Sequence, residues 1–156
     1  MNELYLKIKP YLETKFLIVG LGNILRADDA VGLILARRLK KKTNFSIFDV
    51  ETTFENYLEK IIQKNPQTLF IIDAVDFGGK PGEVKLFSPE ELSSLNLCFT
   101  HNPSLNLGIN YLQNKLKINI IILAIQPKSI AFKRGLSSKV KKAVDLLENL
   151  FILCQR

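Results

Sequence analysis

The 156-residue sequence is poor in the side chains from which most metal and disulfide sites are built. It contains one histidine, two cysteines and no tryptophan. One histidine cannot supply a Cys2His2 zinc finger, a three-histidine zinc site or the HExxH motif of helical metalloproteases. Two cysteines, Cys98 and Cys154, cannot form a four-cysteine metal site or a disulfide-rich scaffold. Any chemistry that needs an imidazole must therefore use His101.

Long hydrophobic runs are also missing. The longest apolar segments span residues 16–19, 69–72 and 120–125, far short of the roughly 20 residues that a membrane-spanning helix needs. The first 15 residues mix acids and lysines with apolar residues and lack the apolar core of a signal peptide. We therefore expect a cytoplasmic protein with reduced thiols that does not interact with a membrane.

Positive charge is in excess, with a formal net charge of +7. Lysines gather at residues 40–42, where a helix is expected to end, and at residues 139–142, where another is expected to begin. Lysine at a helix C-terminus is favoured by the helix dipole, and no aromatic residue is interleaved with either run. We interpret the charge as a solvated surface. An acidic protein partner is the next alternative, and nucleic acid is the least favoured, because no recognised binding motif accompanies the charge.

Short apolar runs alternate with amphipathic segments of ten or more residues. Strands are expected within residues 15–23, 45–50, 69–72, 83–87 and 118–125, and helices at 28–42, 54–63, within 100–116 and from 137 onward. A further helix start is expected at residues 88–91. Continuous apolar strands are typical of a parallel sheet covered on both faces. We predict a single domain, residues 1–156, with an α/β three-layer sandwich: a mostly parallel twisted sheet of about five strands with helices on both faces.

The first expected strand ends in a glycine turn formed by Gly20, Leu21, Gly22 and Asn23. A dinucleotide-binding loop would read GxGxxG, and Leu25 occupies the position of its third glycine. An acid at the end of the second strand, Asp49 or Glu51, keeps a nucleotide-binding module open as an alternative. The other interpretation is a tight turn in which the glycines supply conformational freedom.

Three acidic residues lie where the carboxyl ends of the expected strands should meet, the usual ligand-binding edge of such sheets. Asp28 and Asp29 begin the first long helix, where one acid can cap the helix while its neighbour points into the crevice. Asp73 follows a buried strand, so its carboxylate either bonds to nearby backbone N–H groups or awaits a cation. His101 precedes a later helix and is either a structural residue or a ligand. Asp29, Asp73 and His101 together offer two hard oxygens and one borderline nitrogen, a set suited to a divalent transition-metal ion.

At these positions the sequence resembles the [NiFe]-hydrogenase maturation endopeptidases, most closely the branch that serves hydrogenase 3-type and archaeal enzymes. The resemblance extends from about residue 16 to residue 151. Four stretches carry it: VGLGNILRADDAVG at 19–32, FIIDAVDFGGKPGEV at 70–84, FTHNPSLN at 99–106 and LAIQP at 123–127.

The resemblance implies an activity. Family members remove a short C-terminal extension from the hydrogenase large-subunit precursor after nickel insertion, and they are thought to recognise the nickel that the precursor holds. The implied site residues, catalytic and metal-contacting, are Asp29, Asp73 and His101. No permanently bound cofactor, nucleic acid or membrane is implied. Gly20, Gly22, Asn23 and Asp28 are expected to shape the loop around Asp29.

One loop departs from the family pattern. Family members usually carry Gly-Gly or Gly-Thr after the acid that follows the second strand, but here residues 49–53 read DVETT. Without glycine this loop is expected to adopt a positive φ less easily, whereas Glu55 and Asn56 match family positions nearby. Two alternatives to a peptidase remain at this stage: a nucleotide-binding α/β module that uses the Gly20 turn and Glu51, and a non-catalytic hydrogenase assembly factor.

Overall fold

The computed structural model describes residues 2–97 and 105–155. Its sheet has five strands in the order β2-β1-β3-β5-β4, and β4 is antiparallel to β5 while the other pairs are parallel. The strands are β1 (Phe16–Leu21), β2 (Ile47–Glu51), β3 (Thr68–Ala74), β4 (Val84–Phe87) and β5 (Asn119–Ile125). The α-helices are α1 (Asn2–Leu12), α2 (Val31–Lys42), α3 (Leu58–Lys64), α4 (Pro89–Ser94), α5 (Leu105–Lys115) and α6 (Ser138–Leu153), with 3-10 turns at η1 (Ala27–Ala30) and η2 (Phe54–Tyr57).

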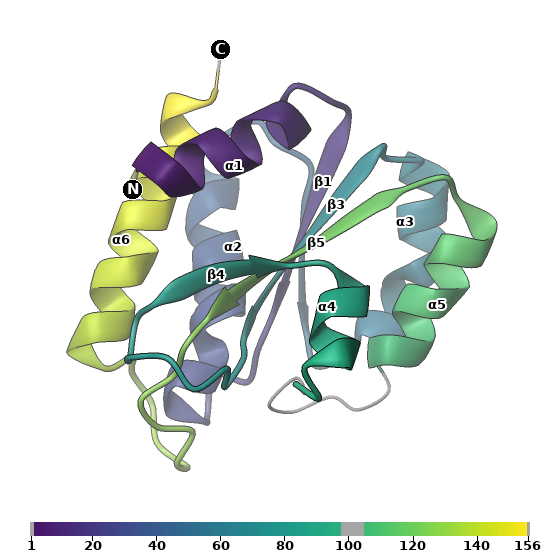
Figure 1. The fold of residues 1–156 in the computed structure, drawn as a ribbon. Coiled ribbons are helices and arrows are strands. Elements are labelled where there is room, and N and C mark those ends of the chain that lie inside the picture. The colour runs from purple at the N-terminus through teal and green to yellow at the C-terminus, as the bar shows by residue number, and fades with distance from the viewer. Residues whose placement is uncertain (1, 98–104, 156) are drawn as a thin grey trace.

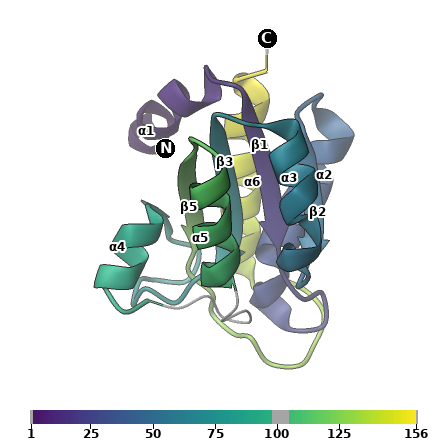
Figure 2. The same ribbon diagram turned by 90° about the vertical axis from the view of Figure 1, so that its right-hand side faces the viewer.

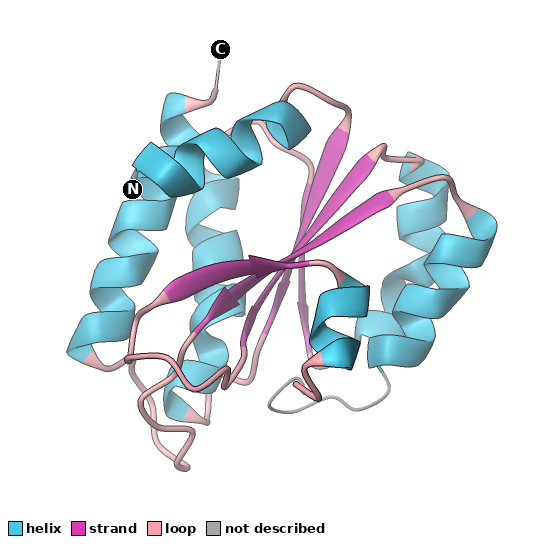
Figure 3. Ribbon diagram, in the orientation of Figure 1, coloured by secondary structure: helices cyan, strands magenta, loops and turns pink. Residues whose placement is uncertain are grey.

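Helices cover both faces of this sheet (Figures 1 and 3). Side chains from α1, α2 and α6 pack with one set of strand residues, and side chains from α3, α4 and α5 pack with the alternate set. Neighbours along β1 show the alternation, because Ile18 belongs to the first core and Leu17 and Val19 belong to the second. The turned view places α3 and α5 in front of the sheet and α6 behind it (Figure 2). The predicted three-layer α/β architecture is confirmed.

The expected apolar stripes are the buried faces of these elements. All seven residues of β3 are buried, as a central parallel strand requires. In α6 the apolar stripe formed by Val140, Val144, Leu147 and Phe151 is at most 1% exposed. The expected helix start at residues 88–91 is the capping box of α4, in which Ser88 and Glu91 cap each other's backbone. No helix in the described part of the chain is long and apolar enough to span a membrane.

Three boundaries differ from the sequence expectation. The N-terminal helix α1 was not predicted, because Ile8 is its only buried residue and Pro10 lies inside it. β3 extends beyond Ile72 to Ala74, since Asp73 and Ala74 continue the ladder with β5. The helix expected from residue 28 starts instead as the 3-10 turn η1. The expected start of the helix within residues 100–116 lies outside the described residues, as do Cys98 and His101.

Candidate functional site

The parallel strands end together at one edge of the sheet, the lower edge in Figure 1. Four loops meet this edge, spanning residues 22–26, 52–53, 75–83 and 126–137. The three acids singled out in the sequence lie at or beside the same edge. Asp28 and Asp29 belong to η1, and Asp73 is the second-last residue of β3. All three are fully buried.

Glycines allow η1 and the start of α2 to lie directly on the strand ends. A Cβ atom at Gly22 would be 2.4 Å from the carbonyl oxygen of Asp29, and one at Gly32 would be 2.0 Å from the carbonyl oxygen of Ile72. A Cβ at Gly20 would be 2.3 Å from the Cβ of Ala36. Any side chain at these positions would push the turn away from β1 and β3. Gly20 and Gly22 thus permit α2 and η1 to lie close to the end of β1, and Gly32 permits α2 to lie close to β3.

The turn after β1 is fixed by its own hydrogen bonds. Asn23 Oδ1 accepts the N–H of Leu25 at 2.9 Å, and the Asn23 carbonyl accepts the N–H of Arg26 at 3.0 Å. The N–H of Gly22 donates to the carbonyl of Glu51 at 3.0 Å. A phosphate-binding loop would direct such N–H groups at its ligand, and its helix would not begin with two buried acids. This geometry argues against the nucleotide-binding alternative.

Asp28 anchors a distant loop. Its carboxylate accepts the N–H groups of Lys128 at 2.9 Å, Ser129 at 3.2 Å and Ser137 at 2.7 Å, and the Ser137 hydroxyl at 2.9 Å. The preceding residue, Ala27, has a φ of 49°, a turn that a non-glycine residue rarely adopts. The sequence suggested that one acid of the pair caps its own helix. Asp28 instead binds the segment between β5 and α6, and it shapes the site by holding that segment beside η1.

Asp29 and Asp73 come from two elements that contact each other, η1 and β3. Asp73 Oδ1 accepts the N–H of Ala74 at 2.8 Å, which agrees with the backbone-bonded interpretation of this residue. Both side chains are 0% exposed, and a carboxylate without water is costly to keep charged unless hydrogen bonds or a cation compensate. Elements that carry two buried carboxylates thus meet at one edge of the sheet.

His101, the third member of the predicted trio, lies outside the described residues, in the segment that joins α4 to α5. Within residues 2–97 and 105–155, no group of three His, Cys, Asp or Glu side chains is placed to hold a metal ion. The trio therefore stays a prediction, with the positions of two of its members known.

Gln126, directly after β5, orders the loop that follows β3 at this edge of the sheet, a role that the sequence did not reveal. It is 6% exposed, and its Oε1 accepts the N–H groups of Phe77 at 2.9 Å and Gly79 at 3.1 Å. Its Nε2 donates to Asp76 Oδ1 at 3.0 Å, and Asp76 also accepts the N–H of Gly78. These hydrogen bonds lower the pKa of Asp76 below its ordinary value. Asp76 caps its turn, and Gln126 lies in the LAIQP stretch that carries the family resemblance, although the sequence assigned it no role.

The loop without glycines reaches a positive φ nevertheless. Glu51 adopts a φ of 55°, and its carbonyl accepts the Gly22 N–H mentioned above. Its side chain accepts from Arg37 at 3.2 Å, and Asp49 binds both Arg37 at 3.1 Å and Lys40 at 2.6 Å. The two acids that kept the nucleotide alternative open are thus paired with cations of α2. Glu55 and Asn56 are exposed on η2.

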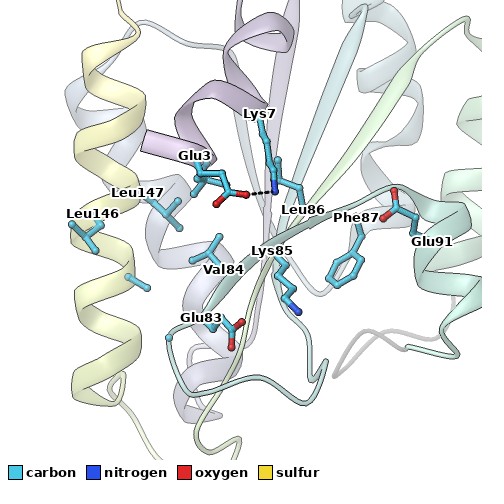
Figure 4. A pocket seen from close by; sticks show the side chains of 13 residues that line it. Glu3, Lys7, Glu83, Val84, Lys85, Leu86, Phe87, Glu91, Leu146 and Leu147 are labelled. Carbon is cyan, nitrogen blue, oxygen red and sulfur yellow. Dashed lines mark ion pairs between the residues drawn. The ribbon is translucent and has the colours of Figure 1, made fainter. Parts of the chain in front are cut away.

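A cavity of about 600 Å³ lies away from the three aspartates, between α1, β4 and α6 (Figure 4). Apolar side chains such as Val84, Leu86 and Leu147 line it, and an ion pair between Glu3 and Lys7 crosses its upper rim. None of the three aspartates lines this cavity, so it is separate from the candidate site.

Comparisons with known proteins match this chain to one family. A family model described as hydrogenase maturation protease matches residues 30–153. The hydrogenase 3 maturation protease of Escherichia coli is 32% identical over 133 residues, which cover 82% of this chain and 83% of the relative. A putative hydrogenase maturation protease of Methanocaldococcus jannaschii is 32% identical over 149 residues, covering 88% of this chain and 86% of the relative.

Solved structures show the same fold. The crystal structure of a [NiFe] hydrogenase maturation protease from Thermococcus kodakarensis superposes with a TM-score of 0.84 at 25% sequence identity, covering 95% of this chain and 97% of that one. The crystal structure of a hydrogenase 3 maturation protease has a TM-score of 0.75 at 28% identity, covering 88% and 89%. The resemblance noted in the sequence is confirmed over nearly the whole chain.

Proposed function

Because the chain belongs to the hydrogenase maturation protease family, we propose that it is an endopeptidase acting on a [NiFe]-hydrogenase large-subunit precursor. In this proposal it removes the C-terminal extension of the precursor after nickel has been inserted. The metal belongs to the substrate, and the enzyme recognises it through Asp29, Asp73 and His101.

The observation that supports this most strongly is the meeting of η1 and β3, which brings buried Asp29 and buried Asp73 to one edge of the sheet. Carboxylate oxygens and an imidazole nitrogen are suitable ligands for a divalent transition-metal ion. Asp28 already accepts four hydrogen bonds from the 128–137 segment, so its carboxylate is committed to structure. In this proposal Asp29 and Asp73, which the resemblance singles out, are the acids that engage the substrate.

The chemical step in this proposal is hydrolysis of one peptide bond. An acid of the site, or a water that the site polarises, acts as the base toward the scissile carbonyl. Recognition of the precursor's nickel by the same side chains fixes which peptide bond lies beside that base. A precursor without nickel would bind without this alignment, so cleavage would wait for metal insertion.

The test uses purified precursor with and without nickel, and it follows the mass of the large subunit over time. Asp29→Asn, Asp73→Asn and His101→Ala should each lower cleavage of the nickel-loaded precursor by at least about 100-fold, the usual contribution of a general acid or base. Asn keeps the shape of Asp while removing its charge. Asp49→Asn, which changes an acid at the surface beside α2, is the matched control and should cleave normally.

Full activity in all three site variants would contradict the site assignment. Equal cleavage of nickel-free and nickel-loaded precursor would contradict recognition of the metal. Tight binding of the precursor by the wild-type protein, with no cleavage under any condition, would favour the non-catalytic assembly factor instead.

A further inference from the structure

The segment that Asp28 anchors carries an unusual surface. Residues 128–134, here named the basic loop, lie between β5 and α6 and extend below the sheet in Figure 1. Lys128, Lys133 and Arg134 are exposed, and Phe132 is 81% exposed. No other large apolar side chain in the described part of the chain is so open to solvent.

The basic loop is tied to η1 and so to the candidate site. The N–H of Ala27 donates to the carbonyl of Lys133 at 2.8 Å, and the N–H of Asp28 donates to the carbonyl of Ser129 at 3.0 Å. The Asp28 carboxylate accepts the N–H groups of Lys128 and Ser129 in return. These bonds join the loop to the residues immediately before Asp29. An exposed aromatic ring on an anchored backbone loses little conformational freedom on binding, which is typical of an interface anchor.

The cations of the basic loop differ from four of the five cations of α2. Arg37, Arg38, Lys40 and Lys42 all form ion pairs with acids of β2 or α6. Across residues 2–97 and 105–155, none of the ion pairs includes Lys128, Lys133 or Arg134. Three positive side chains around an exposed phenylalanine are complementary to a segment that carries acidic and apolar side chains.

We propose that the basic loop is a docking surface for an acidic, apolar surface segment of the hydrogenase large-subunit precursor. The choice of partner rests on the proposed function. A substrate engaged at Asp29 would lie near this loop, because Ala27 and Asp28, the two residues before Asp29, are hydrogen-bonded to it. Docking at Phe132 strengthens binding of the precursor, while the carboxylates at the sheet edge act on the bond to be cleaved.

Single-stranded nucleic acid is the other polymer that binds basic and aromatic surfaces. Such sites usually stack successive bases on several aromatic rings, and the basic loop has only Phe132. A protein segment is therefore the better match.

Steady-state cleavage of nickel-loaded precursor tests the proposal. Phe132→Ser should raise KM about tenfold, the effect of losing about 1.4 kcal/mol of binding, and leave kcat within twofold. The triple variant K128A/K133A/R134A should raise KM at low salt, and its KM should then vary less with NaCl than that of the wild type. Matched controls are Leu153→Ser, at a side chain that is 74% exposed, and K9A/K41A/K64A, which removes three exposed lysines that form no ion pair in the described part of the chain.

Unchanged KM in Phe132→Ser and in the triple variant, with a wild type that cleaves normally, would overturn the docking surface and leave the proposed function intact. If the wild type fails to cleave, the proposed function is wrong, and direct binding of the precursor to the same variants still decides whether the loop docks it. An equal rise in KM for the control variants would show a loss of charge or solubility and would contradict the proposal. Weaker binding of a single-stranded RNA by Phe132→Ser, with KM for the precursor unchanged, would assign the loop to nucleic acid and overturn it as well.

Discussion

Asp28 and Glu148 are two buried carboxylates that the fold stabilises in opposite ways. Asp28, at the carboxyl edge of the sheet, is 0% exposed and accepts only uncharged donors, three backbone N–H groups and one hydroxyl. Glu148, on α6, is 4% exposed and accepts from the charged side chains of Arg38 and Lys42. Both carboxylates have hydrogen-bond partners, but only the charge of Glu148 is neutralised by positive side chains.

The difference matters for the candidate site. Two positive charges about 4 Å apart repel each other by about 4 kcal/mol at an effective dielectric constant of 20, and the repulsion falls as their separation grows. A lysine or arginine bound to Asp28 would therefore oppose a metal ion at neighbouring Asp29. Dipoles hold Asp28 without adding such a charge. On the α2–α6 face no ligand has to approach, and full ion pairs join the two helices.

The largest loss of stability should come from removing the carboxylate of Asp28. Asp28→Ala deprives four donors of their acceptor, and we expect a loss of about 3 kcal/mol in the free energy of unfolding, measured by urea denaturation. The basic loop should also lose its attachment to the Asp28 carboxylate and keep only its backbone hydrogen bonds to Ala27 and Asp28, so KM for the precursor should rise. A loss below 1 kcal/mol would mean that water replaces the carboxylate, and the contrast with Glu148 would then fail. Ser137→Ala, which removes one of the four donors, is the control and should cost only about 1 kcal/mol.

A smaller effect is expected on the α2–α6 face. Glu148→Gln removes the charge that Arg38 and Lys42 share, but these two side chains are 32% and 53% exposed and can be hydrated instead. We expect a loss of about 1–2 kcal/mol in unfolding free energy and no change in cleavage. A loss of cleavage without a loss of stability would show that the two regions are coupled.

The same residue predicts a pH dependence. Burial would raise the pKa of Glu148, but hydrogen bonds from Lys42 and Arg38 and their positive charges outweigh it, so the pKa lies below its ordinary value. A carboxyl group with a lowered folded pKa stabilises the fold above its unfolded pKa of about 4.3, and this contribution is lost as pH falls through the folded pKa. The wild type should therefore lose stability below about pH 4.3 more steeply than Glu148→Gln. If the unfolding free energies of the wild type and of Glu148→Gln fell equally steeply with pH, the lowered pKa of Glu148 would be contradicted.

The fold and the position of the site were largely predictable from local sequence patterns. Apolar runs such as residues 69–72 and the stripe of α6 report burial directly, because their spacing matches the strand and helix periods. The turn after β1 and the acids near the strand ends then follow from the topology of a parallel sheet. The close contacts that individual glycines allow could not be predicted from the sequence. The approach of Gly32 to Ile72, for example, depends on a strand elsewhere in the chain.

The partners of the charged residues were not predictable. Lys40 and Lys42 read as a solvated helix end, yet they bind Asp49 and Glu148, the latter about a hundred residues away. Asp28 read as a helix cap, yet its donors come from residues 128–137. A sequence shows that a charge is present, whereas its partner is set by tertiary contacts that local periodicity does not encode. The positive φ of Glu51 was also not predictable, because its loop contains no glycine that would indicate it.

The smallest effect should come from Asp49, which has the same type of ion pairs as Glu148 but more solvent. Its side chain is 23% exposed, and the exposed fractions of its partners Arg37 and Lys40 are 44% and 46%. Partial burial raises its pKa less than the hydrogen bonds from Lys40 and Arg37 lower it, so its pKa is below the ordinary value. Water screens such pairs, and Asp49→Asn should cost no more than about 0.5 kcal/mol, a difference that should vanish in 1 M NaCl. A salt-independent loss as large as that of Glu148→Gln would show that burial does not govern how strongly these carboxylates stabilise the fold.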